Sequence, residues 1–434
     1  MVKCTTALMM GVAWMAPDQR PSSTDYIDAE NVDVRCHYTN PNHLSICERA
    51  IEVLEEVWPI QVDQWGWYPP FPDNGEGGST ALDVYISTDA DGGAYVTSPY
   101  TDADRSDGRM GGYAHMVLDP TIPSDELHIY VAHEFNHVLQ FATDFTESTT
   151  PIWEASATWA EGHSYPGEGD ANYYAPDFQR TPWASILMDG TALWNRHDIW
   201  SFYEYGAVMW LDHLDLVYDV QPLDIWMAMT NDSWENEPDV LDAWGSLTGS
   251  WEDALLAFSI ERARVGTDAV GDWAASYRNN SRIRNAPVLS TLDEIVEPEE
   301  DPYDLGVVYF DVQVDGDPVA FAFEGGDTVR WGVVLVGDGV VADTSQPIIV
   351  SESQLVGVVN LGPEGFDSDD GVRQRPLSAW LEAAPADGDT GVAVDDTGGG
   401  DGGGKGCGCA SGGSGGAAGF WLLGAIALFR RRES

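Results

Sequence analysis

Apolar and polar positions in the first two thirds of the chain repeat mainly at helical spacing. Segments in which apolar residues recur every three to four positions are typical of amphipathic helices. This spacing predicts helices over 44–57, 124–142, 151–163, about 199–218 and 250–264. Ser124, which two acidic residues follow, is expected to cap the second of these. Apolar and polar residues alternate over 81–86 and 113–119, which predicts strands. The Gly- and Asp-rich stretch 87–112 between them is expected to be a loop.

The pattern changes after the acidic, Pro-containing run 292–303. From Tyr309 to Glu382, short alternating segments are separated by Gly, Asp and Pro, which is typical of a β-sandwich. The expected strands are VVYFDVQV, PVAFAF, VRWGVVLV, PIIV and LVGVV. Helices followed by strands indicate the α+β class, with a first domain over 29–280 and a β-sandwich domain over 300–383.

Both ends of the chain carry features of exported proteins. Residues 1–16 combine one Lys, a short apolar run and small residues, as a secretory signal peptide does. At the other end, the Gly- and Asp-rich stretch 384–406 is expected to be a flexible linker. It leads into 407–434, where the apolar run 417–429 would span about 20 Å as a helix, against a hydrocarbon core of about 30 Å.

The order of linker, Cys407 and Cys409, short apolar segment and three terminal arginines resembles the MYXO-CTERM sorting signal of myxobacteria. The resemblance implies delivery to the cell surface or outer membrane and cleavage near these cysteines by a sorting protease. A simple tail anchor in a membrane is the alternative. Either interpretation predicts an exported, envelope-attached or secreted protein.

The charge balance narrows the possible partners. The chain has 20 basic and 72 acidic residues, a formal net charge of −52. Such a surface repels nucleic acid and anionic lipid, so no nucleic-acid partner is expected. Of the five cysteines, Cys36 and Cys47 form a close pair. They could form a disulfide in an exported protein or remain two buried thiols.

The strongest chemical motif is His133-Glu134-Phe135-Asn136-His137, an HExxH sequence. On a helix, residues four apart share a face, so both imidazoles can bind one cation. Zinc accepts neutral imidazole nitrogens and keeps a position for water in catalytic sites. Glu134, next to the first ligand, is expected to be the general base that takes a proton from this water.

The third ligand distinguishes the HExxH families. Metzincins continue the motif with Gly and His, where this chain has Gln140 and Thr143. The segment Ile152-Trp153-Glu154-Ala155-Ser156-Ala157 instead resembles the helix of thermolysin-like enzymes and the aminopeptidase N family that carries the third ligand. The resemblance implies a zincin-like catalytic domain with Glu154 bound to zinc. Glu161, seven residues further along, is expected to support a ligand or to replace Glu154.

Two further features follow from the same resemblance, which covers roughly residues 80–215. Tyr203-Glu204-Tyr205-Gly206-Ala207 resembles the Y-E-K-G-A segment whose Tyr stabilises the oxyanion. The resemblance implies that Tyr203 stabilises the oxyanion, and Tyr205 is the alternative. Both tyrosines could instead be aromatic residues of the core. The strand 113–119 takes the place of the edge strand that binds extended peptide.

The resulting hypothesis is a zinc metalloprotease that acts on peptides or proteins, similar to putative surface metalloproteases of myxobacteria. Because the G-x-M-E-N exopeptidase motif is absent, we expect an endopeptidase. A surface binding protein with a zincin-like scaffold and a non-peptide metallohydrolase are the alternatives. Asp102, Asp104 and Asp107 with Gly108 form an acidic loop whose spacing departs from the EF-hand pattern. It could bind Ca²⁺, but a solvated loop without an ion is the favoured interpretation.

Overall fold

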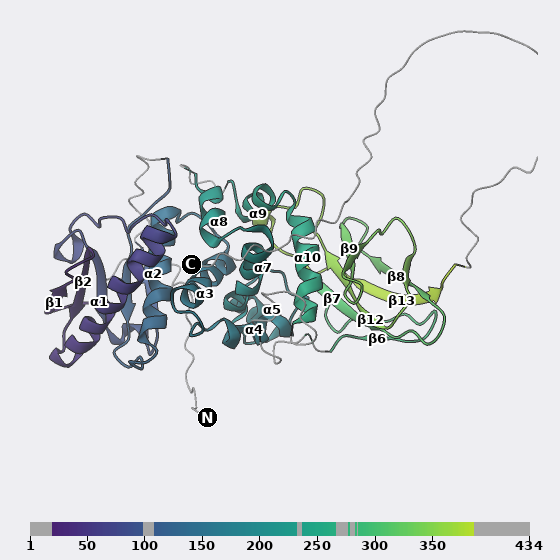
Figure 1. The fold of residues 1–434 in the computed structure, drawn as a ribbon, viewed down its shortest axis with the longest axis horizontal. Helices are drawn as coiled ribbons and strands as arrows, with labels where there is room; N and C mark the ends of the chain where they lie inside the picture. Colours follow the sequence, from purple (N-terminus) through teal and green to yellow (C-terminus); the bar gives the residue numbers. More distant parts are fainter. Residues whose placement is uncertain are drawn as a thin grey trace, which may run out of the picture. The chain divides into compact units, whose positions relative to one another are not determined.

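Helix α1 (Leu44–Trp58) and helix α2 (Leu127–Thr143) pack on a five-stranded mixed sheet in the N-terminal part of the computed structural model (Figure 1). The structure describes residues 20–98, 108–231, 237–265, 277, 283 and 285–385. The order of the sheet is β1-β2-β3-β5-β4. Its strands are β1 (Asp25–Asp28), β2 (Val34–Tyr38), β3 (Leu82–Ile86), β4 (Ala94–Thr97) and β5 (His115–Leu118).

The position of β5 differs from the expectation. The predicted edge strand 113–119 is an inner strand, paired with β3 on one side and with β4 on the other. The edge belongs to β4, which runs antiparallel to β5 and lies inside the stretch expected to be a loop. Four residues that follow a pair of glycines give too short an alternation to distinguish a strand from a loop.

The two faces of this sheet have different chemistry. Alternate strand residues such as Val84 and Met116 join the apolar core beneath α1 and α2. The other alternate residues include His37 and Asp83, whose side chains are buried and hydrogen-bonded to each other at 2.8 Å. Cys36 on β2 forms a disulfide with Cys47 on α1, so the disulfide alternative is confirmed.

Helices fill the middle of the chain. They are α3 (Thr150–Ser164), α4 (Ala171–Arg180), α5 (Gly190–His197), α6 (Tyr203–Gly206), α7 (Val208–Tyr218), α8 (Pro222–Met229), α9 (Val240–Thr248) and α10 (Trp251–Arg264). The predictions for α1, α3 and α10 agree with the structure within one or two residues. Helix α2 begins at Leu127 rather than after the expected Ser124 cap, and α4, α5, α8 and α9 were not predicted.

Two further sheets face each other across one apolar core, the arrangement of a β-sandwich. The first has the order β10-β9-β12-β7-β6 and the second β11-β8-β13. Their strands are β6 (Val288–Leu289), β7 (Val307–Val312), β8 (Val319–Gly325), β9 (Trp331–Leu335), β10 (Val340–Ala342), β11 (Ile348–Val350), β12 (Gln354–Asn360) and β13 (Leu377–Ala383). The five predicted strands are all present, and the mixed helices and sheets confirm the α+β class.

Helix α10 connects the helical region with these sheets. The Tyr309 hydroxyl on β7 donates to the Ser259 carbonyl at 2.5 Å, and Arg330 pairs with Glu252 at 2.8 Å. The other side of β7 faces the sandwich core, so this sheet contributes to two cores.

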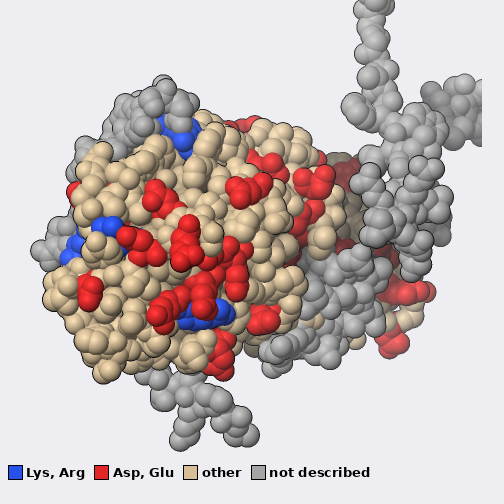
Figure 2. Space-filling model, turned by 60° about the vertical axis from the view of Figure 1, so that its left-hand side comes forward, with Lys and Arg blue, Asp and Glu red and all other residues tan. Residues whose placement is uncertain are grey.

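Acidic side chains spread over the face of the molecule in Figure 2, with few basic ones among them. The described residues contain no helix long and apolar enough to cross a bilayer. The predicted signal peptide 1–16, the linker beyond Pro385 and the tail 407–434 lie outside the described residues.

Candidate metal centre

Helices α2 and α3 carry the predicted ligands and run antiparallel, joined by the loop 144–149. Contacts between the helices pair His133 with Glu161, and His137 with Glu154. A residue early in α2 thus contacts one late in α3. Because the connecting loop is short, the four side chains lie along the interface between the two helices.

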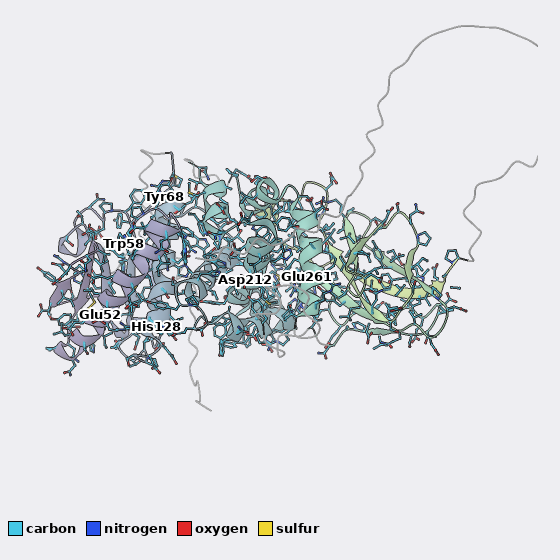
Figure 3. All side chains as sticks on the ribbon, viewed as in Figure 1. Glu52, Trp58, Tyr68, His128, Asp212 and Glu261 are labelled. Carbon is cyan, nitrogen blue, oxygen red and sulfur yellow. A yellow bond between two sulfur atoms is a disulfide. The ribbon has the colours of Figure 1, made fainter. Side chains whose placement is uncertain are left out.

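Helix α2 is buried on nearly every side, unlike the amphipathic helix that the sequence predicted. All its residues except His128 and Tyr130 are buried. It lies among α1, α3, α8 and the strands β4 and β5. Trp58, labelled in Figure 3, lies at the end of α1. Its ring stacks on that of Phe135, with centroids 5.3 Å apart. The HExxH motif therefore belongs to the core rather than to a solvated helix surface.

Three potential ligand atoms converge between the helices. His133 Nε2 and His137 Nε2 are 3.2 Å apart. Glu154 Oε2 lies 3.2 Å from His133 Nε2 and 3.4 Å from His137 Nε2. All three residues are buried and could hold a metal ion.

The triangle of these atoms fits a tetrahedral ion. Zinc binds imidazole nitrogen and carboxylate oxygen at about 2.0–2.2 Å, so two ligands of a tetrahedral ion lie about 3.3–3.5 Å apart. The three observed separations are close to this value. Two imidazoles and one carboxylate form a common set of protein donors in catalytic zinc sites.

The outer nitrogen of each imidazole is held by a separate side chain. His133 Nδ1 is 2.6 Å from Glu161 Oε1, and His137 Nδ1 is 2.7 Å from Gln140 Oε1. An Nδ1–H donated to these oxygens leaves the Nε2 lone pair free for a metal. Glu161 therefore lies behind His133, while the Glu154 oxygen lies with the two Nε2 atoms in a group that could hold a metal ion.

Amide side chains extend this support into the core. Gln140 Nε2 donates to Asn136 Oδ1 and to the Trp153 carbonyl, both at 3.0 Å. Asn136 Nδ2 in turn donates to Gln61 Oε1 at 3.1 Å. Gln61 lies in the single π-helical turn Pro59–Gln64 that follows α1. The sequence singled out Gln140 only as a departure from metzincins, and it carried no signal for Gln61.

Electrostatics distinguish the carboxylates of the centre. Burial raises the pKa of Glu154, but the imidazoles of His137 and His133 outweigh it and lower that pKa to about 2. Glu154 is therefore ionised and suited to bind a cation. Burial raises the pKa of Glu134, against the effect of the same two imidazoles.

Glu134 has the environment expected of a proton acceptor. Its side chain is buried beside the two imidazoles. Within the part of the chain that the structure describes, its carboxylate forms no hydrogen bond or ion pair. A base that has no structural partner can accept a proton from a bound molecule.

The two candidate tyrosines have different surroundings. The Tyr203 hydroxyl donates to the Ala184 carbonyl at 3.0 Å, and its ring packs on Phe178. The Tyr205 ring instead stacks on His133, with centroids 5.7 Å apart. Residues two apart on a helix point to nearly opposite sides. The structure thus places Tyr203 among core aromatics and brings Tyr205, the alternative, to the metal centre.

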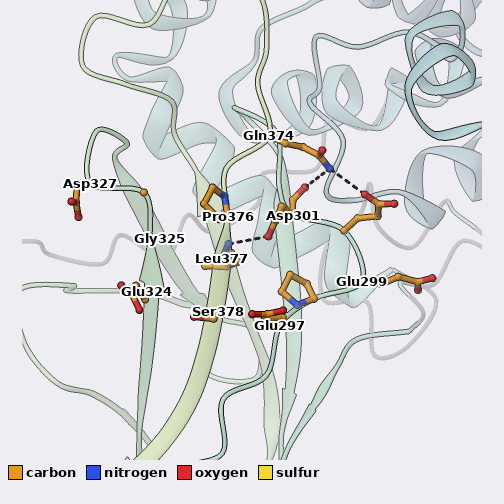
Figure 4. Close-up of a pocket in the computed structure, with 13 residues that line it drawn as sticks. Glu297, Glu299, Asp301, Glu324, Gly325, Asp327, Gln374, Pro376, Leu377 and Ser378 are labelled. Atoms are coloured by element: carbon orange, nitrogen blue, oxygen red, sulfur yellow. Dashed lines mark hydrogen bonds between the residues drawn. The ribbon is translucent and has the colours of Figure 1, made fainter.

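The predicted calcium ligands Asp102, Asp104 and Asp107 lie outside the described residues, which include only Gly108 of that loop. A separate cavity of about 580 Å³ lies in the sandwich region (Figure 4). Its lining is rich in carboxylates but has no histidine, and Asp301 there accepts the Leu377 amide at 2.9 Å. This cavity lacks the mixed nitrogen and oxygen donors of the α2–α3 interface.

Comparison with known proteins adds no further constraint on the centre. No protein-family description matches the chain. No curated protein matches it either.

Proposed function

We propose that the protein is a zinc-dependent peptidase whose metal is held by His133, His137 and Glu154. The strongest support is the distance of 3.2–3.4 Å that separates the two histidine Nε2 atoms and Glu154 Oε2 from one another. In addition, each histidine Nδ1 is hydrogen-bonded to a side-chain oxygen. Zinc, when bound, supplies Lewis-acid chemistry that activates water and polarises the scissile carbonyl.

The chain's own side chains supply the remaining functions. Glu134 takes the proton of the attacking water and passes it to the leaving amine. Its raised pKa brings its proton affinity closer to that required near neutral pH. Tyr205 replaces Tyr203 as the proposed hydroxyl donor to the developing oxyanion, because its ring lies against His133. Glu161 and Gln140 orient the two imidazoles.

The sheet supports a peptide as the substrate. Among the described strands, β4 pairs only with β5, and α2 packs against both. The other edge of β4 offers backbone groups that an extended peptide can pair with. We assign this role to β4 in a zincin-like domain over 29–280, with a β-sandwich domain over 300–383.

The remaining sequence features complete the proposal. The missing exopeptidase motif favours cleavage within chains, and the predicted signal peptide and sorting tail favour an activity outside the cell. A sorting protease would then process the precursor near Cys407 or Cys409.

The test combines metal analysis with an assay. Purified full-length protein should contain one zinc per chain and cleave an unfolded protein substrate. Removal of zinc with a chelator should abolish cleavage, and added zinc should restore it. Cleavage that persists in zinc-free protein would reject the proposal. One bound zinc without cleavage of any peptide would retain the metal centre and reject the substrate class.

A further inference from the structure

The two imidazoles of the α2–α3 centre are held by different kinds of side chain. His133 Nδ1 faces Glu161, and an ionised carboxylate can only accept a hydrogen bond. His137 Nδ1 instead faces the amide of Gln140 at 2.7 Å. An amide can present either its oxygen or its NH2 group. Because only the Nδ1–H tautomer leaves the Nε2 lone pair for a metal, the direction of the Gln140 amide decides whether His137 can be a ligand.

Gln140 is one end of a continuous chain of three buried amides. Its Nε2 donates to Asn136 Oδ1 at 3.0 Å, and Asn136 Nδ2 donates to Gln61 Oε1 at 3.1 Å. Gln61 Nε2 donates to the Ala132 carbonyl at 3.0 Å. All three amide side chains are at most 1% exposed, so solvent does not compensate for a reversed amide.

Backbone carbonyls fix the direction of this chain at both ends. The Trp153 carbonyl accepts from Gln140 Nε2 at 3.0 Å, and the Ala132 carbonyl accepts from Gln61 Nε2. A carbonyl oxygen cannot donate. Reversal of the chain would therefore set an amide oxygen against a carbonyl oxygen at each end, and such buried, unpaired groups are costly. In the observed direction the Gln140 oxygen faces His137, so the hydrogen bond between them requires the proton on Nδ1.

We propose that Gln61 is a positioning residue of the metal centre, which keeps His137 in the Nδ1–H tautomer through Asn136 and Gln140. The inference rests on the proposed zinc site and adds to it a residue from another element. Gln61 is the buried residue of the π-helical turn Pro59–Gln64 after α1. Turns of this kind are frequent at functional sites. The turn thus acts on a ligand of α2 through hydrogen bonds between side chains.

Two substitutions separate this role from a merely structural one. Gln61→Met removes the hydrogen bonds of the side chain and should raise the Kd for zinc by about 10-fold. Gln61→Glu keeps an oxygen that accepts from Asn136, so the Kd should stay close to that of wild type, although a buried carboxylate lowers stability. Competition with a chelator measures the Kd, and urea unfolding of zinc-free full-length protein measures stability. Zinc affinities that simply follow the order of stability would overturn the proposal.

A second buried glutamine provides the matched control. Gln179 is also fully buried, and its Nε2 donates to the Arg262 carbonyl at 2.8 Å. Gln179→Met should therefore lower stability and leave the Kd for zinc unchanged. In protein that already carries Gln140→Met, Gln61→Met should have no further effect on this Kd, because the chain to His137 is broken. Additive effects of the two substitutions would contradict the proposal.

Proton NMR of the cobalt-substituted full-length protein gives a direct signature. The paramagnetic ion moves the Nδ1–H signals of its histidine ligands away from the other resonances. Gln61→Met should speed the solvent exchange of the His137 signal and leave the His133 signal, which Glu161 holds, unchanged. If Gln61→Met does not fold, the pair Asn136→Asp, which keeps an acceptor for Gln140, and Asn136→Leu, which removes it, replaces the first pair.

The outcomes distinguish this inference from the proposed function. Unchanged exchange of both signals in Gln61→Met, with metal bound, would overturn the role of Gln61 and leave the metal centre in place. Protein that binds neither zinc nor cobalt would reject the centre and this inference together.

Discussion

The α2–α3 metal centre and the carboxylate group of Glu237, Asp367 and Asp369 are two candidate metal sites of opposite character. The first combines two imidazoles with one carboxylate, and all three are buried. The second consists only of carboxylates and is partly exposed. In the first, ligand atoms are 3.2–3.4 Å apart and both imidazoles are oriented by neighbours.

This difference shows what a reactive metal centre requires beyond carboxylates that lie close together. Buried nitrogen donors with fixed orientation suit zinc and leave a reactive position beside a free carboxylate. The second group offers only carboxylates, two of them exposed, and has no nitrogen donor. The predictions below change one site while the other serves as the reference.

The largest expected effect comes from a charge-neutral replacement of the base. Glu134→Gln should lower kcat by about 10²–10⁴-fold, because the proton acceptor is lost while the ligands remain. Zinc content, measured by elemental analysis, should stay at one per chain. The matched variant Glu237→Gln in the acidic group should keep both zinc and turnover. Near-normal turnover in Glu134→Gln would contradict the assigned role.

A smaller loss is expected from the tyrosine beside His133. Tyr205→Phe should lower kcat by about 10²-fold, as removal of one oxyanion donor does, with zinc retained. Tyr203→Phe is the control, because that hydroxyl donates to the Ala184 carbonyl. It should lose about 1 kcal/mol of stability and little activity. Steady-state kinetics of both variants check this, and the reverse pattern would restore the original assignment to Tyr203.

The support of His133 should have a measurable effect on metal affinity. Glu161→Gln weakens the hydrogen bond to Nδ1 and should raise the Kd for zinc by about 10–100-fold. Competition with a chromogenic chelator measures this Kd. Glu168→Gln is the control, since Glu168 pairs with His128 at 2.9 Å near the surface. Equal Kd values for Glu161→Gln and wild type would remove Glu161 from the centre.

A buried histidine outside both sites gives the smallest expected effect. Burial lowers the pKa of His213 to about 4, while the unfolded chain takes up the proton near pH 6.5. The unfolded state therefore binds more protons below pH 6.5, and the stability present above that pH declines as the pH falls toward 4.

The measurement compares urea unfolding of His213→Asn and wild type at pH 7 and pH 5. The variant should lose less stability over this interval, by about 1–2 kcal/mol. His163→Asn, which replaces a half-exposed histidine on α3, is the control. Loss of zinc through His133 and His137 affects all three proteins alike. Identical pH dependence of variant and wild type would contradict the assignment.

The sequence predicted the ligand set because its spacing is local. His133 and His137 lie one helical turn apart, and Glu154 was found by resemblance on the next helix. The structure brings these three together as expected. By contrast, the choice between Tyr203 and Tyr205 depends on helix rotation, which a four-residue helix among aromatics does not reveal.

Features that depend on long-range packing were not predictable. The edge position of β4 follows from pairing with β5, since four residues carry little pattern of their own. Helix α2 has the composition of an amphipathic helix, but elements before and after it in the chain bury both its faces. Glu237 and Asp367 are separated by 130 residues, so only the folded chain brings them together.

The most direct test of the central claim is anomalous diffraction at the zinc edge from crystals of the purified protein. The account predicts one strong peak about 2.0–2.2 Å from His133 Nε2, His137 Nε2 and a Glu154 carboxylate oxygen. A peak at Glu237, Asp367 and Asp369 instead, or no peak between α2 and α3 in protein that contains zinc, would contradict it.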